Sequence, residues 1–252
     1  MIKKITIIGS GNIAHHLGVK LFNSGINIHQ VLARNKKSGL KLASKINSIF
    51  INDIKKIEVS ELILICVNDD NIYKIANQLP DIPVVHTSGN TSIEVFKNKK
   101  NSGVIYPVQT IRKNQRVNFK KIPICVEANN DLFQSKIINL CKLLSDKILV
   151  TSSEKRKKIH LSAVIASNFS NFCYTMSYNI LKDNKINFDI LHNLIIQTAK
   201  NCKLREPKLN QTGPAIRKDK TTIREHLASI NDIHYKKIYK LLSENILKEH
   251  EK

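Results

Sequence analysis

Apolar and polar residues follow two different spacings along the first 150 residues. Short runs of Ile, Val and Leu bounded by glycine or polar residues are typical of strands buried on both faces of a parallel sheet. Segments with apolar residues at helical spacing separate these runs. We predict strands at residues 2–8, 28–33, 48–51, 61–67, 83–90, 104–110, 122–127 and 147–150, and the fifth and sixth of these end in polar residues. We predict helices at about 12–24, 40–46, 70–79 and 130–144.

The pattern changes after residue 151, where strand-like runs stop and helical spacing continues to the end. The helices expected there are at about 154–182, 187–203, 221–229 and 232–249. Strands alternating with helices, followed by helices alone, predict an α/β fold. We expect a Rossmann-like, doubly wound and mainly parallel sheet over residues 1–151, followed by an all-α domain over residues 152–252.

A glycine turn follows the first predicted strand. Gly9 and Gly11 occupy the first two glycine positions of the G-x-G-x-x-G/A dinucleotide fingerprint, and Ala14 occupies the third. Gly9 permits the tight turn, Gly11 lets a pyrophosphate lie on the backbone, and Ala14 lets the helix pack on the sheet. We assign cofactor binding to Gly9, Ser10, Gly11, Asn12 and Ile13. The alternative is an ordinary strand-turn-helix that has lost its ligand.

The end of the second predicted strand indicates which dinucleotide is bound. NAD-binding folds place an acidic residue here to accept hydrogen bonds from the ribose. This chain instead has Arg34-Asn35-Lys36-Lys37-Ser38, without a carboxylate. Because Arg34 can pair with a 2′-phosphate that an acid would repel, the sequence predicts NADP, with Arg34 and Asn35 among its binding residues. Alternatively, Arg34 is only a solvated loop charge.

Three further predicted strands end in polar residues. The segments are Val67-Asn68-Asp69-Asp70, His86-Thr87-Ser88-Gly89-Asn90 and Tyr106-Pro107-Val108-Gln109-Thr110. Ligands of open α/β sheets bind beyond the carboxyl ends of the strands. We therefore expect Val67, Asn68, Asp69 and Ser88 to contact the cofactor, and Tyr106 to orient a substrate. Structural loops account for any one of these segments taken alone.

The formal charge of +21 raises the question of a nucleic-acid partner. The lysines are dispersed, however, and no aromatic series accompanies the short basic runs at 97–100 and 155–158 to stack on bases. We therefore expect a small-molecule substrate rather than nucleic acid. A positive surface also helps to attract phosphorylated cofactors and anionic substrates.

The apolar runs, the N-terminal segment and the cysteines indicate the cellular compartment of the protein. No apolar run approaches the roughly 18 residues of a membrane span, and the glycine turn lies where the apolar region of a signal peptide would be. The five cysteines, an odd number, lack C-x-x-C spacing and cluster with no histidines. We expect reduced thiols in a cytoplasmic protein, with no metal site and no membrane partner.

A polar segment interrupts the helical half at Asn210-Gln211-Thr212-Gly213-Pro214-Ala215-Ile216-Arg217-Lys218-Asp219. The planar fork of Arg217 suits a carboxylate, so we expect Arg217 and Asp219 to contact the substrate. Asp219 could instead hold Arg217 in place, and either Asp219 or Thr221 could cap the next helix. A plain inter-helix loop explains Gly213-Pro214 but explains the polar density less well.

The order of these motifs resembles a family of NADP-dependent oxidoreductases that joins an N-terminal Rossmann-like domain to a C-terminal helical domain of unknown function. The motifs that carry the resemblance are Gly9-Ser10-Gly11-Asn12, Val67-Asn68-Asp69-Asp70, His86-Thr87-Ser88-Gly89, Tyr106-Pro107-Val108-Gln109-Thr110, His160-Leu161-Ser162-Ala163, Ala166-Ser167-Asn168-Phe169 and Gln211-Thr212-Gly213-Pro214-Ala215-Ile216-Arg217-Lys218-Asp219. They span almost the whole chain.

The family in turn resembles the 6-phosphogluconate dehydrogenase-like group, which includes pyrroline-5-carboxylate reductase. The resemblance implies a helical domain that closes the cofactor cleft and commonly forms a homodimer. Many members of the group carry a catalytic lysine four residues before an asparagine. Here Val164 stands four residues before Asn168, so the lysine role is not carried over.

Hydride transfer requires a proton donor beside the substrate. Our candidates for the catalytic residues are His160, Asn168 and His86. His160 and Asn168 are eight residues apart, about 80° around a regular helix, and share a face only loosely. His160 could also be a capping or core residue, His86 could bond only to backbone, and Tyr106 could be a packing aromatic.

We therefore expect an NADP-dependent oxidoreductase that transfers a hydride to or from a small, carboxylate-bearing substrate. One alternative is a nucleotide-binding regulator or sensor without redox turnover, which the missing lysine favours. The other is a basic protein associated with nucleic acid.

Overall fold

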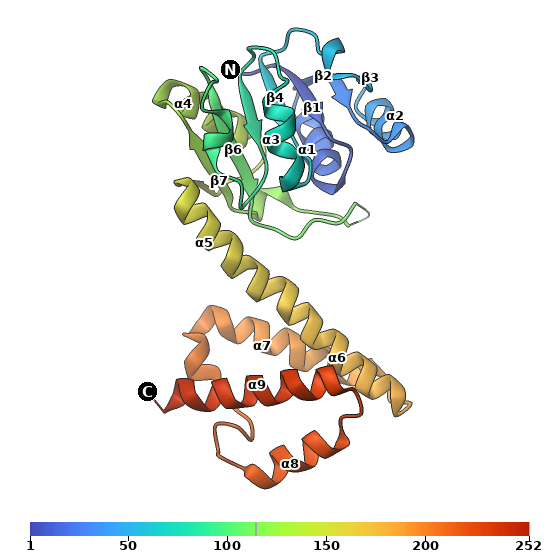
Figure 1. The fold of residues 1–252 in the computed structure, drawn as a ribbon, viewed down its shortest axis with the longest axis vertical. Coiled ribbons are helices and arrows are strands. Elements are labelled where there is room, and N and C mark those ends of the chain that lie inside the picture. The colour runs from blue at the N-terminus through green and yellow to red at the C-terminus, as the bar shows by residue number, and fades with distance from the viewer. Residues whose placement is uncertain (114, 252) are drawn as a thin grey trace. The chain divides into compact units, whose positions relative to one another are not determined.

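The computed structural model describes residues 1–113 and 115–251. Its first part is built on one sheet (Figure 1). The strand order in this sheet is β3-β2-β1-β4-β5-β6-β7-β8. The strands are β1 (Lys4–Ile8), β2 (Asn27–Leu32), β3 (Ile49–Ile51), β4 (Leu62–Ile65), β5 (Val84–His86), β6 (Ser102–Pro107), β7 (Ile124–Ala128) and β8 (Ile148–Val150). Strands β1 to β6 pair in parallel, β7 runs antiparallel to β6, and β8 is parallel to β7. This confirms the predicted Rossmann-like, mainly parallel sheet.

Helices cover both faces of the sheet. They are α1 (Asn12–Asn23), α2 (Lys36–Lys45), α3 (Asp69–Ala76) and α4 (Asp131–Lys142), with short 3₁₀ turns at Ile54–Lys56, Ile93–Phe96 and Phe119–Lys121. Apolar residues of α1, α2 and α4 pack in one core with one face of the sheet. Those of α3 pack on the other face with Phe96. The predicted helices therefore form the two outer layers of a doubly wound fold.

Strand β4 shows why its sequence has no polar face. Leu62 and Leu64 belong to the core under α1, whereas Ile63 and Ile65 belong to the core under α3. Successive side chains of a strand point to opposite faces, so a central strand with both faces covered needs apolar residues throughout. All four residues are at most 1% exposed.

The parallel pairing brings the carboxyl ends of β1, β4, β5 and β6 to one edge of the sheet. Gly9, Val67, Thr87 and Val108 are the first or second residues after these strands. The sheet therefore collects the polar segments identified in the sequence at a single edge.

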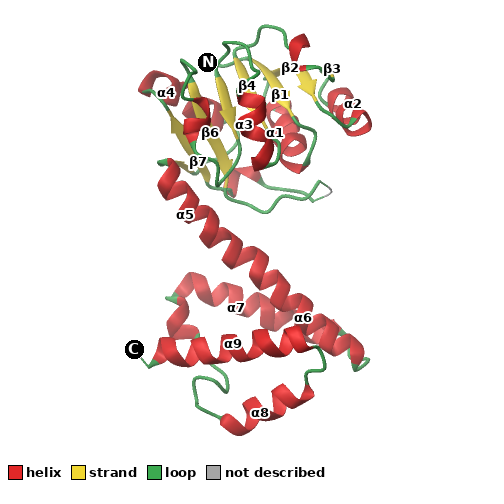
Figure 2. Cartoon of the chain, in the orientation of Figure 1, coloured by secondary structure: helices red, strands yellow, loops and turns green. Residues whose placement is uncertain are grey.

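Helices and loops make up the chain after Val150 (Figure 2). They are α5 (Ser153–Ala163), a π-helical segment (Val164–Phe169), α6 (Ser170–Asp183), α7 (His192–Leu204), α8 (Lys220–Ser229) and α9 (Ile233–His250), with 3₁₀ turns at Phe188–Leu191 and Pro207–Asn210. The first three occupy the range predicted as one long helix. The π-helical segment in its middle was not predicted.

The chain forms two compact units, which divide between Asn168 and Phe169. Strands end near residue 151, as expected, but α5 belongs to the sheet unit. The N–H and hydroxyl of Ser153 both donate to Glu127 on β7, which fixes the start of α5 to the sheet.

Candidate functional site

The glycine turn between β1 and α1 is shaped for a close approach of a ligand to the backbone. Gly9 has a φ of +119°, which L side chains rarely adopt, and a Cβ at this position would collide with the carbonyl oxygen of Cys66. Its N–H donates to the carbonyl of Leu32 at 2.8 Å, so the turn is anchored between two strands.

Gly11 differs from Gly9 because a Cβ there would meet nothing within 4 Å. Gly11 stands at the N-cap of α1 and provides no side-chain cap, and the first turn of α1 carries no acidic residue. The helix start therefore has no capping side chain and no nearby acid of its own first turn to satisfy its N–H groups and the positive end of the helix dipole. This arrangement suits the pyrophosphate of a dinucleotide, and Ser10, Asn12 and Ile13 lie in the same turn.

The start of α2 lies beside this turn. The hydroxyls of Ser10 and Ser38 are 2.7 Å apart. Asn35 caps α2 by accepting the N–H of Ser38 at 2.9 Å, so its side chain also has a structural role. Arg34, Lys36 and Lys37 are exposed around this helix start. A group bound here therefore meets hydroxyls and cations, which is the chemistry that a 2′-phosphate requires.

The segment after β4 forms a second wall next to the glycine turn. The Cγ1 atom of Val67 lies 3.4 Å from the position that a Cβ of Gly9 would take. Asn68 is the N-cap of α3 without a side-chain hydrogen bond to the helix, and Asp69 is exposed in its first turn. The structure thus brings Val67, Asn68 and Asp69 to the edge where the sequence placed them.

His86, at the end of β5, is fully buried. Its Nδ1 accepts the N–H of Ser88 at 3.2 Å. Burial, with a smaller contribution from the cation of Arg156, lowers the pKa of His86 to about 3. A histidine that stays neutral at physiological pH has no extra proton to give, so the structure argues against His86 as the general acid.

Ser88 builds the turn that follows β5. Its hydroxyl oxygen accepts the N–H groups of Asn90 at 3.0 Å and of Thr91 at 2.8 Å. Ser88 is 7% exposed. Both acceptor positions of the hydroxyl are used by the turn, and only its hydrogen is left for a cofactor.

Tyr106 and His160 form a hydrogen-bonded pair that the sequence did not join. The Tyr106 Oη and the His160 Nδ1 are 3.0 Å apart, and the rings meet edge to face at 5.6 Å between centroids. Tyr106 comes from β6 and His160 from α5. Burial raises the pKa of the Tyr106 hydroxyl, while the charge of Arg156 opposes this shift.

Gly89 lies directly against this pair. A Cβ on Gly89 would come within 2.6 Å of Nδ1 of His160 and 2.8 Å of Cζ of Tyr106. The turn after β5 therefore serves as the wall on which both rings rest. Gly89 was quoted in the sequence motif, but its packing role required the structure.

Asn168 ends the sheet unit and lies, exposed, in the π-helical segment. The neighbouring Ser167 hydroxyl is 2.9 Å from that of Thr110, which follows β6. A π turn contains more residues than an α turn and so rotates less per residue. This lowers the offset of about 80° that a regular helix gives between His160 and Asn168.

Arg156 is the functional candidate that sequence reasoning missed. It was part of the basic run Lys155-Arg156-Lys157-Lys158, yet it is 0% exposed whereas its three neighbours are exposed. Its guanidinium bonds to Glu127 and to the carbonyls of Ser88 and Gly89. The available clue was its position four residues before His160, which places both on one face of a helix.

Arg217 and Asp219 belong to the helical unit. Arg217 is exposed. Asp219 caps α8, because its carboxylate accepts the N–H of Thr222 at 3.0 Å and the Thr222 hydroxyl at 2.7 Å. These bonds, above all the backbone one, lower the pKa of Asp219. Of the alternatives for Asp219, the structure shows the cap.

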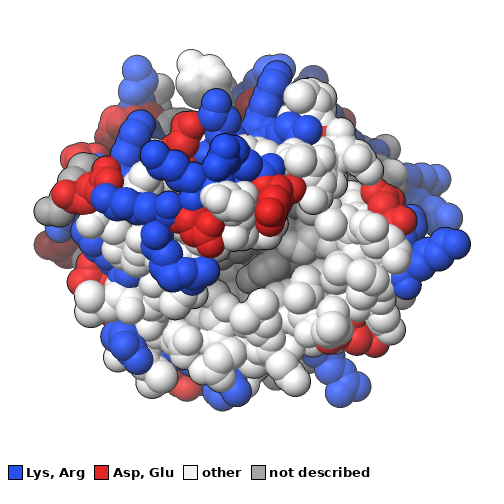
Figure 3. Space-filling model, turned by 90° about the horizontal axis from the view of Figure 1, so that it is seen from below, with Lys and Arg blue, Asp and Glu red and all other residues white. Residues whose placement is uncertain are grey.

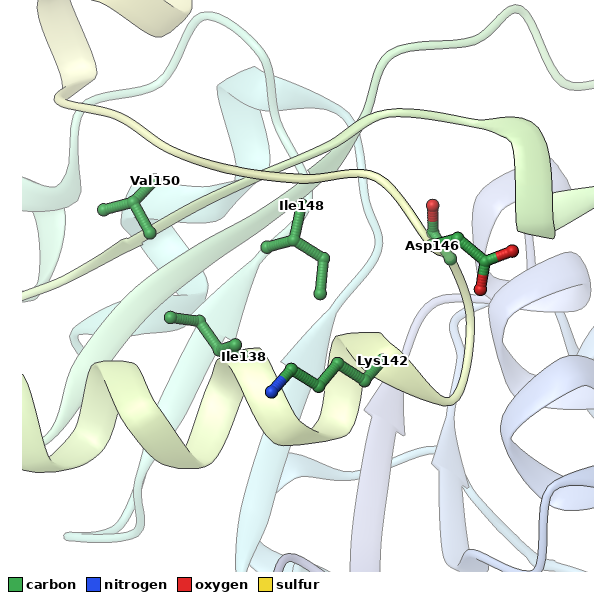
Figure 4. A pocket seen from close by; sticks show the side chains of 6 residues that line it. Ile138, Lys142, Asp146, Ile148 and Val150 are labelled. Carbon is green, nitrogen blue, oxygen red and sulfur yellow. The ribbon is translucent and has the colours of Figure 1, made fainter.

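A hollow lies in the sheet unit between α4 and the edge strand β8 (Figure 4). Its lining residues are Ile138, Lys142, Ser145, Asp146, Ile148 and Val150. Strands β4 to β7 separate β8 from β1 in the sheet order, so this hollow is not part of the glycine-turn site. Asp146 pairs with Lys120 at 3.1 Å.

Over residues 1–113 and 115–251, no cluster of three or more His, Cys, Asp or Glu side chains is arranged to hold a metal ion. In the same residues, no helix has the length and apolar character needed to cross a membrane. On the face shown in Figure 3, the basic side chains form separate groups mixed with acidic ones, and a broad area is uncharged.

Comparison with known families and structures agrees with this geometry. A model of the family described as "NADP oxidoreductase coenzyme F420-dependent" matches residues 4–89, and one described as "Domain of unknown function (DUF2520)" matches residues 122–246. No curated protein matches the chain.

Several solved structures share the fold. A proposed NADP oxidoreductase from Bacteroides fragilis has 32% identity and a TM-score of 0.91, with 98% of each chain covered. A Thermotoga maritima protein has 24% identity and a TM-score of 0.71, again with 98% of each chain covered. A reductive aminase from Aspergillus terreus, solved with NADPH and ethyl-5-oxohexanoate, has 12% identity and a TM-score of 0.75, over 99% of this chain and 95% of that one. The chain belongs to the family of NADP oxidoreductases that pair a Rossmann-like domain with a helical domain of unknown function, and NADP is its cofactor.

Proposed function

We propose that this enzyme transfers a hydride between NADP(H) and the C=N or C=O carbon of a small, carboxylate-bearing substrate, with Tyr106 and His160 handling the proton. The observation that carries the proposal is the 3.0 Å contact between Tyr106 Oη and His160 Nδ1. This pair lies in the same unit as the glycine turn, and Tyr106 is near the carboxyl end of a strand parallel to β1.

The residues at the glycine turn fit NADP. The open space above Gly11 accepts the pyrophosphate against the uncapped start of α1. Ser10, Ser38 and Arg34 would hold the 2′-phosphate, and Val67 to Asp69 would line the path toward the nicotinamide. NADPH supplies a hydride when bound; the remaining chemistry falls to the side chains of this chain.

The proton is proposed to pass through the Tyr106–His160 pair. As the double bond of the substrate is reduced, its nitrogen or oxygen takes the proton of the Tyr106 hydroxyl. The Tyr106 oxygen then takes the proton that Nδ1 of His160 carries, and the imidazole takes a proton from solvent in its place. The raised pKa of Tyr106 keeps its proton in place until the substrate needs it.

The substrate class draws on two considerations. Among proteins of similar fold are a reductive aminase and a pyrroline-5-carboxylate reductase, names that imply reduction at carbon bonded to nitrogen. Arg217, whose planar fork suits a carboxylate, is the proposed group for the substrate's acid function. An Arg217→Ala enzyme is expected to show a raised KM for an acid substrate and unchanged affinity for NADPH.

The decisive experiment is a panel of substrates assayed by the absorbance of the reduced nicotinamide. The panel holds glyoxylate and pyruvate with and without ammonia, the cyclic imino acid pyrroline-2-carboxylate, and 3-hydroxy acids with NADP⁺. Tyr106→Phe and His160→Asn are expected to bind NADPH like the unaltered enzyme and to lose turnover. Full turnover in both variants would contradict the role of the pair.

We also propose a homodimer formed through the helical unit. Among the described residues of this unit, only Met176, Ala215 and Ile230 are apolar and buried. Large apolar side chains remain exposed, among them Phe169, Phe172, Ile190, Leu194, Ile196, Leu241 and Leu242. A second copy that covers them would supply the missing core.

The dimer is tested by light scattering coupled to size-exclusion chromatography. Leu194→Glu places a charge on exposed apolar surface of α7 and is expected to yield monomers or aggregates. Lys200→Glu, on the same helix, is the matched control and should leave the dimer intact. A monomer for the unaltered chain at every concentration would contradict the proposal.

A cytoplasmic location is the corresponding proposal for compartment. Cys66, Cys125 and Cys141 are buried free thiols, and burial raises the pKa of Cys66 and Cys141 to about 12. Such thiols are unreactive and need no oxidising environment. Fractionation of cells that produce the protein is expected to recover it with cytoplasmic markers.

A further inference from the structure

The geometry points to Arg156 as a positioning residue that holds the Ser88–Gly89 turn against the Tyr106–His160 pair. The inference rests on the proposed function, because it gives Arg156 a role in the reaction only if that pair handles the proton. The composition of the basic run at 155–158 does not distinguish Arg156 from its neighbours, because such a run is typical of a solvated, charged segment.

The guanidinium binds the turn directly. Its Nη1 donates to the carbonyl of Ser88 at 2.9 Å and to the carbonyl of Gly89 at 3.1 Å. Arg156 is 0% exposed, so these bonds do not compete with water. A turn whose two successive carbonyls bond to one planar group has little freedom to shift.

The other end of the guanidinium is fixed to the sheet. Its Nη2 donates to Glu127 Oε2 at 3.0 Å and to the Ser153 hydroxyl oxygen at 2.9 Å. Ser153 in turn accepts the N–H of Ile93, which belongs to the segment after the same turn. Arg156 therefore ties β7, the start of α5 and the turn after β5 into one network.

Only arginine can make all four bonds. They use four donors in a flat fork, pointing in two directions, whereas a lysine ammonium offers three donors from a single atom. A lysine here would keep the charge next to Glu127 but would release at least one carbonyl of the turn. This difference lets charge and geometry be tested separately.

The turn transmits its position to the reacting side chains through Gly89. The Cα of Gly89 lies so close to the pair that an added Cβ would come within 2.7 Å of Cγ of His160. Arg156 and His160 are one helical turn apart on α5, so the same helix that clamps the turn also carries the ring resting on it. Movement of the turn would open a gap behind both rings.

The charge of Arg156 acts on the same groups. It works against the rise in the pKa of Tyr106 and contributes to the lowered pKa of His86. The buried cation thus limits the rise in the Tyr106 pKa that burial causes, and it adds to the larger effect of burial that keeps the neighbouring His86 neutral. Position and charge both favour proton transfer from Tyr106.

The test compares three variants of the full chain. Arg156→Lys keeps the positive charge and removes the planar guanidinium that donates in two directions. The double variant Arg156→Met/Glu127→Gln removes both charges, so no buried carboxylate is left unpaired. Lys157→Met, at the adjacent exposed position, is the matched control. Each is checked for thermal unfolding and for NADPH binding by fluorescence before further measurement.

The first readout is the imidazole NMR spectrum of His160 with NADP⁺ bound, assigned by its loss in His160→Asn. Tyr106→Phe supplies the reference for a broken pair. We expect the double variant to shift the His160 signals to that reference, Arg156→Lys to shift them part of the way, and Lys157→Met to leave them unchanged. Lys157→Met is expected to bind NADPH like the unaltered enzyme. The Arg156 variants are expected to keep NADPH binding and to lose at most the contribution of Ser88, since the glycine turn is untouched.

The second readout is steady-state kinetics with pyrroline-2-carboxylate. We expect kcat to fall about 100-fold in the double variant with a smaller change in KM, as for a misplacement near 1 Å. Arg156→Lys should recover part of kcat and keep the alkaline limb of the pH profile close to its original position.

A folded double variant with an unchanged His160 spectrum and unchanged kcat would overturn the inference. If this variant does not fold, Arg156→Lys decides by the same criteria. If instead Tyr106→Phe keeps full turnover, the proposed function fails, while the NMR comparison still shows whether Arg156 positions the pair.

Discussion

Replacing Gly89 with alanine tests how closely the turn after β5 supports the Tyr106–His160 pair. The new Cβ would lie 2.6 Å from Nδ1 of His160 and 2.8 Å from Cζ of Tyr106, while ordinary contacts begin at 3.4 Å. To restore them, the His160 ring must retreat by 0.8 Å and the Tyr106 ring by 0.6 Å, the differences between these distances.

Such a retreat changes the chemistry more than the fold. Overpacking a site of this kind costs about 1–3 kcal/mol of stability, which a folded domain can tolerate. The hydrogen bond of 3.0 Å joins Tyr106 Oη to His160 Nδ1. It is broken if one ring moves away by this amount and the other does not follow. Because a misplacement near 1 Å can cost about 100-fold in rate, we expect kcat to fall by about 10- to 100-fold.

The assay is turnover of pyrroline-2-carboxylate with NADPH, together with the His160 NMR spectrum and NADPH binding. Asn90→Ala, the exposed next residue of the same turn, is the matched control and should behave like the unaltered enzyme. Wild-type turnover and an unchanged His160 spectrum in Gly89→Ala would refute the reasoning, because they would show that the rings do not depend on this wall.

Three further predictions concern the cofactor, the buried histidine and the helical unit. Arg34→Ala is expected to weaken NADPH binding about 10- to 100-fold, the worth of a hydrogen bond to a charged group, and to leave NADH binding unchanged in the same fluorescence titration. The pKa of His86 is near 3 in the folded chain and 6.5 when exposed, so below about pH 6.5 the unfolded chain binds a proton that the folded chain does not. This residue should therefore lower the free energy of unfolding by about 1.4 kcal/mol for each unit that the pH falls. In urea unfolding, His86→Asn should lack this pH dependence. Asp219→Ala should speed amide hydrogen exchange in α8, and Asp219→Asn should do so much less, because asparagine can still cap the helix. Since the pKa of Asp219 is lowered in the folded chain, its contribution to stability is lost as the pH falls through that lowered pKa.

Local patterns gave most of the architecture. Runs such as Leu62–Ile65 predict strands covered on both faces, because a residue with a polar side chain cannot be buried there without a partner. Gly9 and Gly11 mark the turn in the sequence, since side chains rarely adopt the φ of Gly9 and the absence of a side chain at Gly11 leaves the space beside its backbone open. These requirements are local, so they can be recognised without knowing what packs where.

The π-helical segment at Val164–Phe169 was not predictable in this way. Its residues have ordinary helical spacing, so no local pattern marks the wider turn. Only the structure shows this turn, together with the contact between Ser167 in it and Thr110. Likewise, Asp219 had three possible roles in the sequence, and only the bonds to Thr222 show that it caps α8.

By itself the sequence determined the doubly wound sheet, the helical second half and the preference for NADP, because short-range spacing and side-chain type suffice for each. The place of the dinucleotide phosphates at the glycine turn is a prediction of the same kind. The tertiary structure decided which polar groups act together. Tyr106 and His160 are 54 residues apart, and Arg156 and Gly89 are 67 apart. No local pattern encodes such contacts. They exist because parallel strands deliver their ends to one edge, where Arg156 and His160 of α5 meet the turn after β5 and Tyr106. Burial at this edge covers Arg156 and lowers the pKa of His86, which argues against His86 as the proton donor.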